Sequence, residues 1–323
     1  MTGPTGVVAA STGESERLSA GALGWLGRHL DHFDPYSARA AASPHGKAKA
    51  VLELALLCHC WSRLDTADDP RLDTATGFLR TLWRRPDFAR LVTADPRCAT
   101  EYALVHAALA PAGTGAEARR SALALAAADG LTGDGLTGDG RSPLARLELR
   151  YYAEKAGVRH RIEPYPELIA RNVLVTLPAA ARTVPDGEPP VGIPEAYALT
   201  HSAFYLADFG RTGAPLPAEA RADALDLVGR LLAHCVRRDW WDLAAELLMA
   251  QRCLGLDPLR TPEGAAAIAC LARAQRPDGA LPGRSPATSA APEDPVGERF
   301  AKAYHTTLVT ALMTLLLGAG SGA

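Results

Sequence analysis

Ionisable side chains recur along this sequence at a nearly constant interval. The segment YALVHAA at 102–108 returns as YALTHSA at 197–203, 95 residues later, and half of that interval is about one helical hairpin. Every second expected helix then carries one such residue at a similar position: His59, His106, Tyr152, His201, Glu246 and His305. Imidazoles and carboxylates are the usual groups of acid–base catalysis and of transition-metal binding. The spacing therefore predicts one shared polar site.

Five of the polar residues are candidates for catalysis: His201, His305, Glu246, Asp242 and Tyr152. We expect the two histidines to act as acid–base groups or ligands and Tyr152 to orient the substrate. Asp242 and Glu246 lie one helical turn apart on the same face, where paired carboxylates split their pKa values or bind a metal. Alternatively, Asp242 lies in the first turn of a helix, where an acid interacts favourably with the helix dipole, and Glu246 faces a buried arginine.

The same residues include a candidate metal site. Neutral imidazoles with one carboxylate suit zinc, iron or manganese, which makes His201, His305 and Glu246 the expected ligands. No two of the four repeat histidines lie four residues apart on one helix, so this site depends on tertiary convergence. In the alternative interpretation, each histidine is a hydrogen-bonded residue of the core.

Further residues are expected to contact a substrate. Arg150 offers a cation for an anionic or carbonyl group, and Trp241 offers an apolar wall. Asp208, two turns after His201, either fixes the tautomer of that imidazole or caps the helix end. The full expected set is His59, His106, Arg150, Tyr205, Trp241 and Asp208.

Apolar residues recur with helical periodicity through most of the chain, and no segment alternates as a strand does. We expect about twelve helices joined by short Pro/Gly turns, forming an all-α, (α/α)6 toroid whose inner helices line an axial cavity. Residues 1–16 are small and polar and are expected to be a disordered tail. Residues 17–323 are expected to form a single domain.

Composition excludes some partners. Lys and Arg number 34 against 36 Asp and Glu, for a net charge of −2, and no basic block is present to bind phosphates, so nucleic acid is excluded. The most apolar stretch, residues 306–318, is too short to span a bilayer, and the first residues lack the features of a signal peptide. We expect a cytoplasmic protein that meets a small-molecule substrate and no membrane; the sequence leaves the oligomeric state open.

The C-terminal segment resembles a known superfamily. Gln275, followed by Asp278-Gly279 and then by AYHTTL at 303–308, is similar to the closing hairpin of protein prenyltransferase β-subunits and terpenoid cyclases, where Q-x-x-D-G precedes a helix that begins D-x-Y-H-T. The resemblance implies a toroid. The zinc site of that family uses the histidine, matched by His305, with an Asp and a Cys at the start of the preceding inner helix. Here that helix begins DWWD at 239–242, without a thiolate, and Lys302 replaces the family's second Asp.

These observations favour an enzyme of bacterial specialised metabolism that acts on a small, partly apolar molecule by acid–base or metal-assisted chemistry. Cyclisation, isomerisation, elimination and hydrolysis all stay open. One alternative is a non-catalytic binding or scaffold toroid. Another is a prenyl or terpenoid enzyme without the zinc thiolate. The segments at 199–210 and 241–248 also resemble an uncharacterised bacterial family.

Overall fold

All regular structure in the protein is helical. The computed structural model describes residues 4–37, 44–65, 68–131, 140–182, 184 and 188–319, and every regular element in these ranges is an α-helix or a short 3-10 turn. The expectation of an all-α fold is confirmed. An Ala- and Leu-rich composition with few aromatic and β-branched residues explains it, since such residues form and pack helices well.

The chain divides into two compact units. The first, unit 1, combines residues 1–28 with residues 169–323, and the second, unit 2, comprises residues 29–168. Contacts are denser within each group of helices than between the two groups, and the single domain expected from the sequence stays a prediction. The toroid and its axial cavity stay predictions.

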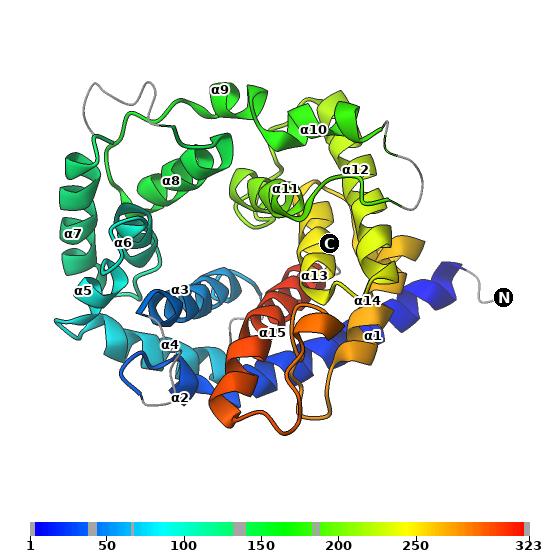
Figure 1. Ribbon diagram of the computed structural model, residues 1–323, viewed down its shortest axis with the longest axis horizontal. Helices are drawn as coiled ribbons and strands as arrows, with labels where there is room; N and C mark the ends of the chain where they lie inside the picture. Colours follow the sequence, from blue (N-terminus) through cyan, green and yellow to red (C-terminus); the bar gives the residue numbers. More distant parts are fainter. Residues whose placement is uncertain are drawn as a thin grey trace. The chain divides into compact units, whose positions relative to one another are not determined.

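Unit 2 is built around α3 and α6. Helix α6 packs against α5, α7 and α8, while α3 packs against α2, α4 and α5 (Figure 1). Its helices are α2 (Leu30–Phe33), α3 (Pro44–Trp61), α4 (Pro70–Trp83), α5 (Phe88–Val92), α6 (Ala99–Ala108), α7 (Gly115–Ala128), α8 (Pro143–Ala156) and α9 (Tyr165–Ala170), whose last residues lie past the unit boundary.

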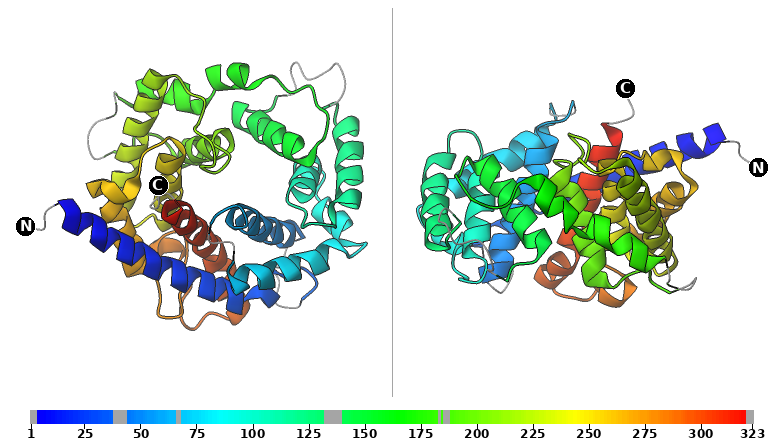
Figure 2. Two further views of the ribbon diagram at one scale, coloured as in Figure 1. Left: turned by 180° about the vertical axis from the view of Figure 1, so that it is seen from behind. Right: turned by 90° about the horizontal axis from the view of Figure 1, so that it is seen from above.

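Unit 1 is built around α13. This helix packs against α11, α12, α14 and α15, and α1 lies along α14 and α15 (Figure 1, Figure 2). The elements of this unit are α1 (Pro4–Arg28), α10 (Val173–Ala181), α11 (Ile193–Leu206), α12 (Ala218–Arg237), α13 (Trp241–Cys253), η1 (Pro258–Arg260), α14 (Pro262–Ala274), η2 (Pro286–Thr288) and α15 (Val296–Gly318).

Helix α13 is buried on all sides. Every residue of it except Arg252 is buried, including Asp242, Glu246 and Gln251. Burying a charged or polar group costs free energy unless the group is paired or hydrogen-bonded. The two carboxylates of α13 must therefore find partners on the helices around it.

The motif Q-x-x-D-G joins α1 to the rest of unit 1. The Gln275 side chain donates from Nε2 to the carbonyl oxygens of Leu18, at 3.1 Å, and Gly279, at 3.0 Å. Gly279 has a φ of 95°, and a Cβ at this position would lie 2.2 Å from the carbonyl oxygen of Gly21. The motif thus forms a tight turn against the backbone of α1, and only glycine leaves room for it.

The N-terminal helix begins before the expected domain boundary. Helix α1 begins at Pro4, within the segment 1–16 that was expected to be a tail, and residues 1–3 lie outside the described ranges; the disordered tail stays a prediction. Ser15 and Leu18 are buried in this helix.

The apolar C-terminal stretch is also longer than expected. It belongs to α15, a helix of 23 residues that by length and composition alone could cross a membrane. Of its most apolar window, 72% is buried inside the protein, as in the core helix of a globular protein. The cytoplasmic location stays a prediction.

Candidate active site

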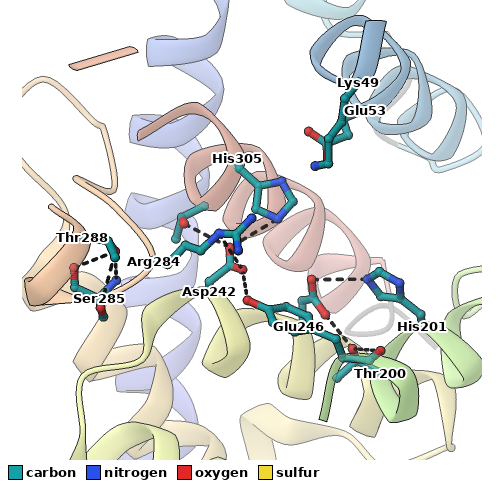
Figure 3. Close-up of polar contacts among 12 residues, drawn as sticks. Lys49, Glu53, Thr200, His201, Asp242, Glu246, Arg284, Ser285, Thr288 and His305 are labelled. Atoms are coloured by element: carbon teal, nitrogen blue, oxygen red, sulfur yellow. Dashed lines mark hydrogen bonds and ion pairs between the residues drawn. The ribbon is translucent and has the colours of Figure 1, made fainter. Parts of the chain in front are cut away.

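Two buried carboxylates lie at the centre of unit 1. Asp242 and Glu246 stand one turn apart near the start of α13, where their side chains are 2–3% exposed. Figure 3 shows them facing His305 of α15 and His201 of α11. The sequence-predicted pairing of carboxylates with these two imidazoles is therefore present in the structure.

Asp242 is held by groups from three other elements. The Tyr197 hydroxyl donates to Oδ2 at 2.6 Å, and the Thr306 hydroxyl donates to Oδ1 at 3.0 Å. His305 Nε2 lies 3.6 Å from Oδ1, and Arg284 Nε lies 3.9 Å from Oδ2. The two hydroxyls thus fix the carboxylate, while the imidazole and guanidinium approach it without forming close hydrogen bonds.

Glu246 has a similar arrangement with fewer partners. The Thr200 hydroxyl donates to Oε2 at 2.5 Å, and His201 Nε2 lies 3.6 Å from Oε1 (Figure 3). The buried arginine considered as a partner for Glu246 is replaced by a threonine and a histidine. Each carboxylate therefore presents one oxygen to an imidazole and keeps another contact with a hydroxyl donor.

The surroundings set the ionisation of the site. Burial opposes the ionisation of Glu246, but the charge of His201, the hydrogen bond from Thr200 and the charge of His305 outweigh it and hold the pKa of Glu246 below its ordinary value. Burial, together with the charge of Asp242 and the hydrogen bond to it, raises the pKa of Tyr197. The phenol therefore keeps its proton and acts as a donor to a carboxylate.

The imidazole of His201 is the open part of the site. Its side chain is 38% exposed, and aromatic rings pack around it: Phe204 at 5.8 Å, Tyr205 at 6.2 Å and Tyr197 at 6.3 Å between ring centroids. Tyr205 was expected to contact substrate, and the structure places it, largely buried, beside the imidazole. His201 thus joins an apolar wall to a buried carboxylate.

A strained turn follows the helix that carries His201. Asp208 and Phe209 have φ values of 47° and 54°, in a region that non-glycine residues rarely adopt, and Gly210 continues at 79°. The Phe209 ring packs on Phe204 at 5.6 Å and on Tyr205 at 6.2 Å. Asp208 thus belongs to the turn that ends α11, and Phe209 supports the aromatic rings beside His201.

Three donors of the cluster converge closely enough for one metal ion. One ligand atom each of Asp242, Glu246 and His305 lie within 4.8 Å of one another. We expected His201, His305 and Glu246 as ligands, so the converging set keeps two of these and adds Asp242. Donors bound to one zinc ion lie about 3.3 Å apart, so side-chain rotations would have to draw them closer by up to about 1.5 Å.

Four predicted site residues belong to unit 2. His106 is buried between Trp83, at 4.8 Å, and Phe88, at 5.2 Å between ring centroids, and burial lowers its pKa to about 4. Tyr152 is buried with its ring edge-to-face against Tyr151. These surroundings are those of core residues, so the predicted substrate contact of His106 and the predicted orienting role of Tyr152 gain no support from them.

The other two residues of unit 2 have local partners. Arg150 donates to the carbonyl oxygens of Ile162 and Glu163 at 2.9 and 2.8 Å, and it pairs with Glu154 at 2.6 Å. Its guanidinium therefore holds the segment after α8 in place. His59 Nε2 lies 3.1 Å from Arg63 on the following turn. Their substrate-binding roles stay predictions.

Several residues of the cluster were not predicted from the sequence. These are Thr200, Thr306 and Arg284, which all contact a carboxylate. Trp241, by contrast, was predicted, and it is buried in the first turn of α13. A local signal was available for the threonines, since each is a direct neighbour of a site histidine: Thr200 precedes His201 and Thr306 follows His305. Nothing local marks Arg284, because it lies in a loop far from Asp242 in the sequence.

Comparison with known proteins identifies a family. The model of a family described as a domain of unknown function, DUF6895, matches residues 19–315. The chain belongs to this family. No curated protein and no solved structure matches it. The match spans nearly all of both units, including every residue of the carboxylate–imidazole cluster, and the resemblance to prenyltransferases and terpenoid cyclases stays a prediction.

Proposed function

We propose that this chain is an enzyme that acts on a small, partly apolar molecule at the cluster of Asp242, Glu246, His305 and His201, with a divalent metal ion bound by the first three. The observation that carries the proposal is the convergence of these three donors at the centre of unit 1. Sites with three protein ligands leave coordination positions open, as catalytic metal sites do.

The donor set supports a metal such as zinc, iron or manganese. The gap of 3.6 Å between His305 Nε2 and Asp242 Oδ1 is too long for a good hydrogen bond but close to the separation of two ligands of one ion. Hydroxyls from Thr306 and Tyr197 hold the Asp242 carboxylate, in the manner of the outer hydrogen bonds that orient metal ligands. When bound, such an ion activates a water molecule or polarises a substrate oxygen.

His201 has a separate role in this proposal. It pairs with Glu246 through Nε2 and its side chain is the more exposed of the two site imidazoles, so it can exchange a proton with a bound molecule. The aromatic rings around it would hold the apolar part of that molecule and exclude water. Bacterial specialised metabolism, as expected from the sequence, supplies molecules of this kind.

Metal analysis of the purified protein tests the proposal. We expect about one equivalent of metal after loading with zinc, iron or manganese, and loss of this metal in Asp242→Asn and His305→Ala. Asp226→Asn serves as a control, because Asp226 is an exposed acid on α12 in the same unit. Loading that is equal in all four proteins would contradict the metal site.

A second measurement addresses catalysis. The metal-loaded protein and its Glu246→Gln variant are incubated with a bacterial metabolite extract, and the extract is compared by mass spectrometry. We expect wild type to convert at least one metabolite that the variant leaves unchanged. A metabolite that binds to both proteins and is recovered unaltered would indicate the alternative, a binding protein.

A further inference from the structure

Arg284 lies beside the carboxylate–imidazole cluster, where it forms a long ion pair with Asp242. Its guanidinium is 54% exposed, and its one ion-pair partner in the described part of the chain is Asp242, at 3.9 Å. The Oδ2 atom that it approaches already accepts the Tyr197 hydroxyl at 2.6 Å. Asp242 therefore forms no close hydrogen bond with the guanidinium, and more than half of the Arg284 side chain is exposed to solvent.

Two other arginines show how closely a guanidinium can pair with a carboxylate in this chain. Arg146 lies 2.7 Å from Glu163, with both side chains largely buried, and Arg97 lies 2.7 Å from Asp95. A guanidinium presents five N–H donors in a planar fork that suits two parallel bonds to a carboxylate or a phosphate. At 3.9 Å from Asp242, Arg284 forms no such pair of bonds, so its N–H donors can bind a ligand at the edge of the cluster.

The backbone around Arg284 is fixed in place. The Asp242 amide donates to the Arg284 carbonyl oxygen at 3.3 Å, which ties the loop to the start of α13. On the other side, the Leu281 amide donates to Thr307 Oγ1 of α15 at 2.9 Å. A guanidinium on such an anchored loop loses less entropy when it binds an anion than one on a mobile loop does.

The loop is also folded tightly on itself. A Cβ on Gly283 would lie 2.6 Å from the Thr288 carbonyl oxygen. Two segments of the loop therefore approach each other closely at the residue before Arg284. The Ala290 amide donates to the Pro282 carbonyl oxygen at 2.8 Å across the same loop. These contacts set the direction in which Arg284 leaves the backbone, toward Asp242 and His305 (Figure 3).

Charge determines what Arg284 can bind. Asp242 and Glu246 carry two negative charges, which one divalent ion neutralises, and the positive charge of Arg284 then remains. His305 and Arg284 approach the two different oxygens of Asp242, so one small molecule can reach both. We propose that Arg284 binds the anionic group, a carboxylate or phosphate, of a small organic substrate and so places the adjoining atoms at the metal-binding cluster. This inference rests on the proposed function, because the metal supplies the charge balance.

Binding of simple anions tests the inference without knowledge of the substrate. Sodium benzoate and inorganic phosphate are titrated in separate experiments by calorimetry into zinc-loaded wild type, Arg284→Gln, Arg284→Lys and the control Arg260→Gln. Arg260 is an exposed arginine of the same unit, paired with Asp257 away from the cluster. Circular dichroism confirms that each variant is folded, and metal analysis confirms that each is loaded.

We expect Arg284→Gln to weaken binding of the preferred anion at least about tenfold and Arg284→Lys to weaken it less, since the lysine keeps the charge but not the planar fork. Arg260→Gln should bind as wild type does. Tighter benzoate binding would identify a carboxylate substrate beside the aromatic rings, and tighter phosphate binding a phosphorylated one. Metal-free wild type should bind both anions weakly, because the two carboxylates then repel them.

The outcomes separate this inference from the proposed function. Metal loading with anion affinities that are the same in wild type and Arg284→Gln would overturn the role of Arg284 and leave the metal site standing. Anion binding that depends on Arg284 in a protein that never binds metal would overturn the metal part of the function and the charge balance argued above. Failure of zinc-loaded wild type to bind either anion would also reject the inference.

Discussion

At the scale of single residues, acidic side chains follow the helical repeat as clearly as the histidines do. An interval of 47 or 48 residues relates Glu53, Glu101, Glu148, Glu195 and Asp242, each on a different helix. In unit 2, burial and then the charge of Glu148 raise the pKa of Glu101 to about 7. In unit 2 the repeat thus places Glu101 and Glu148, both partly buried, close enough for the charge of one to oppose the ionisation of the other.

The raised pKa of Glu101 predicts a pH dependence of stability. The folded pKa of Glu101 lies above its ordinary value of 4.5, so between these values the folded protein binds more protons than the unfolded chain, and the free energy of unfolding falls as the pH rises toward about 7. Glu101→Gln should remove this decline and stabilise the protein at pH 8 by about 1–3 kcal/mol. Urea unfolding at pH 5 and pH 8 measures it. Glu117→Gln, an exposed acid on α7, is the control, and an equal change in both variants would contradict the assignment.

At the scale of elements, the site is produced by helices that meet α13 from different sides. Helix α11 brings Tyr197, Thr200 and His201, and α15 brings His305 and Thr306. Helix α1 packs against α14 and α15 of the same unit, and the Q-x-x-D-G turn contacts α1 through Gln275 and Gly279. The motif therefore has a structural role that is independent of any zinc site.

Gly279→Ala tests that role. The added Cβ would lie 2.2 Å from the Gly21 carbonyl oxygen, and the φ of 95° is unfavourable for alanine, so we expect a loss of about 2–4 kcal/mol in the free energy of unfolding. Gly213→Ala is the matched control, since nothing lies within 4 Å of its Cβ position. Hydrogen exchange should speed up in α1 of the Gly279 variant. Equal stability of the two variants would mean that the turn moves freely to admit a methyl group.

At the scale of the whole molecule, the two ends of the chain build one unit. Residues 1–28 and 169–323 form unit 1 together, while the intervening residues 29–168 form unit 2. Helix α1 contributes Leu18, Ala22 and Trp25 to the core, and Trp25 stacks on Phe300 of α15 at 5.6 Å between ring centroids. The stability of the candidate site thus depends on a helix that ends more than 160 residues before the first residue of the site in the sequence.

Deletion of residues 1–28 should therefore damage unit 1 selectively. The apolar faces of α14 and α15 that pack on α1 become exposed, so their amides should exchange faster and the metal affinity should fall, while protection in α6 and α8 changes little. Hydrogen exchange followed by mass spectrometry measures both units in one experiment. Uniform loss of protection in both would show that the chain unfolds as one cooperative body.

The sequence alone determined the helical class and most of the pairing in the site. Helical periodicity is local, so neighbouring residues are enough to predict it. The repeat identified His201, Glu246 and His305 because equivalent helices carry them. The sequence did not determine that His106 packs between Trp83 and Phe88 or that Arg150 donates to the segment after its own helix. A side chain at one position of the repeat can face either a neighbouring helix or a site.

Tertiary structure decided the rest. Arg284 reaches Asp242 from a loop, Thr200 and Thr306 hold carboxylates across helix interfaces, and Asp242 rather than His201 completes the converging donors. The contacts of Arg284, Thr200 and Thr306 each join residues more than 40 positions apart, and the packing of α11, α13 and α15 fixes the distances between the helices that carry the two threonines and the carboxylates. Periodicity indicates which residues share a helix face, whereas only the packing of the helices determines which atoms come within bonding distance.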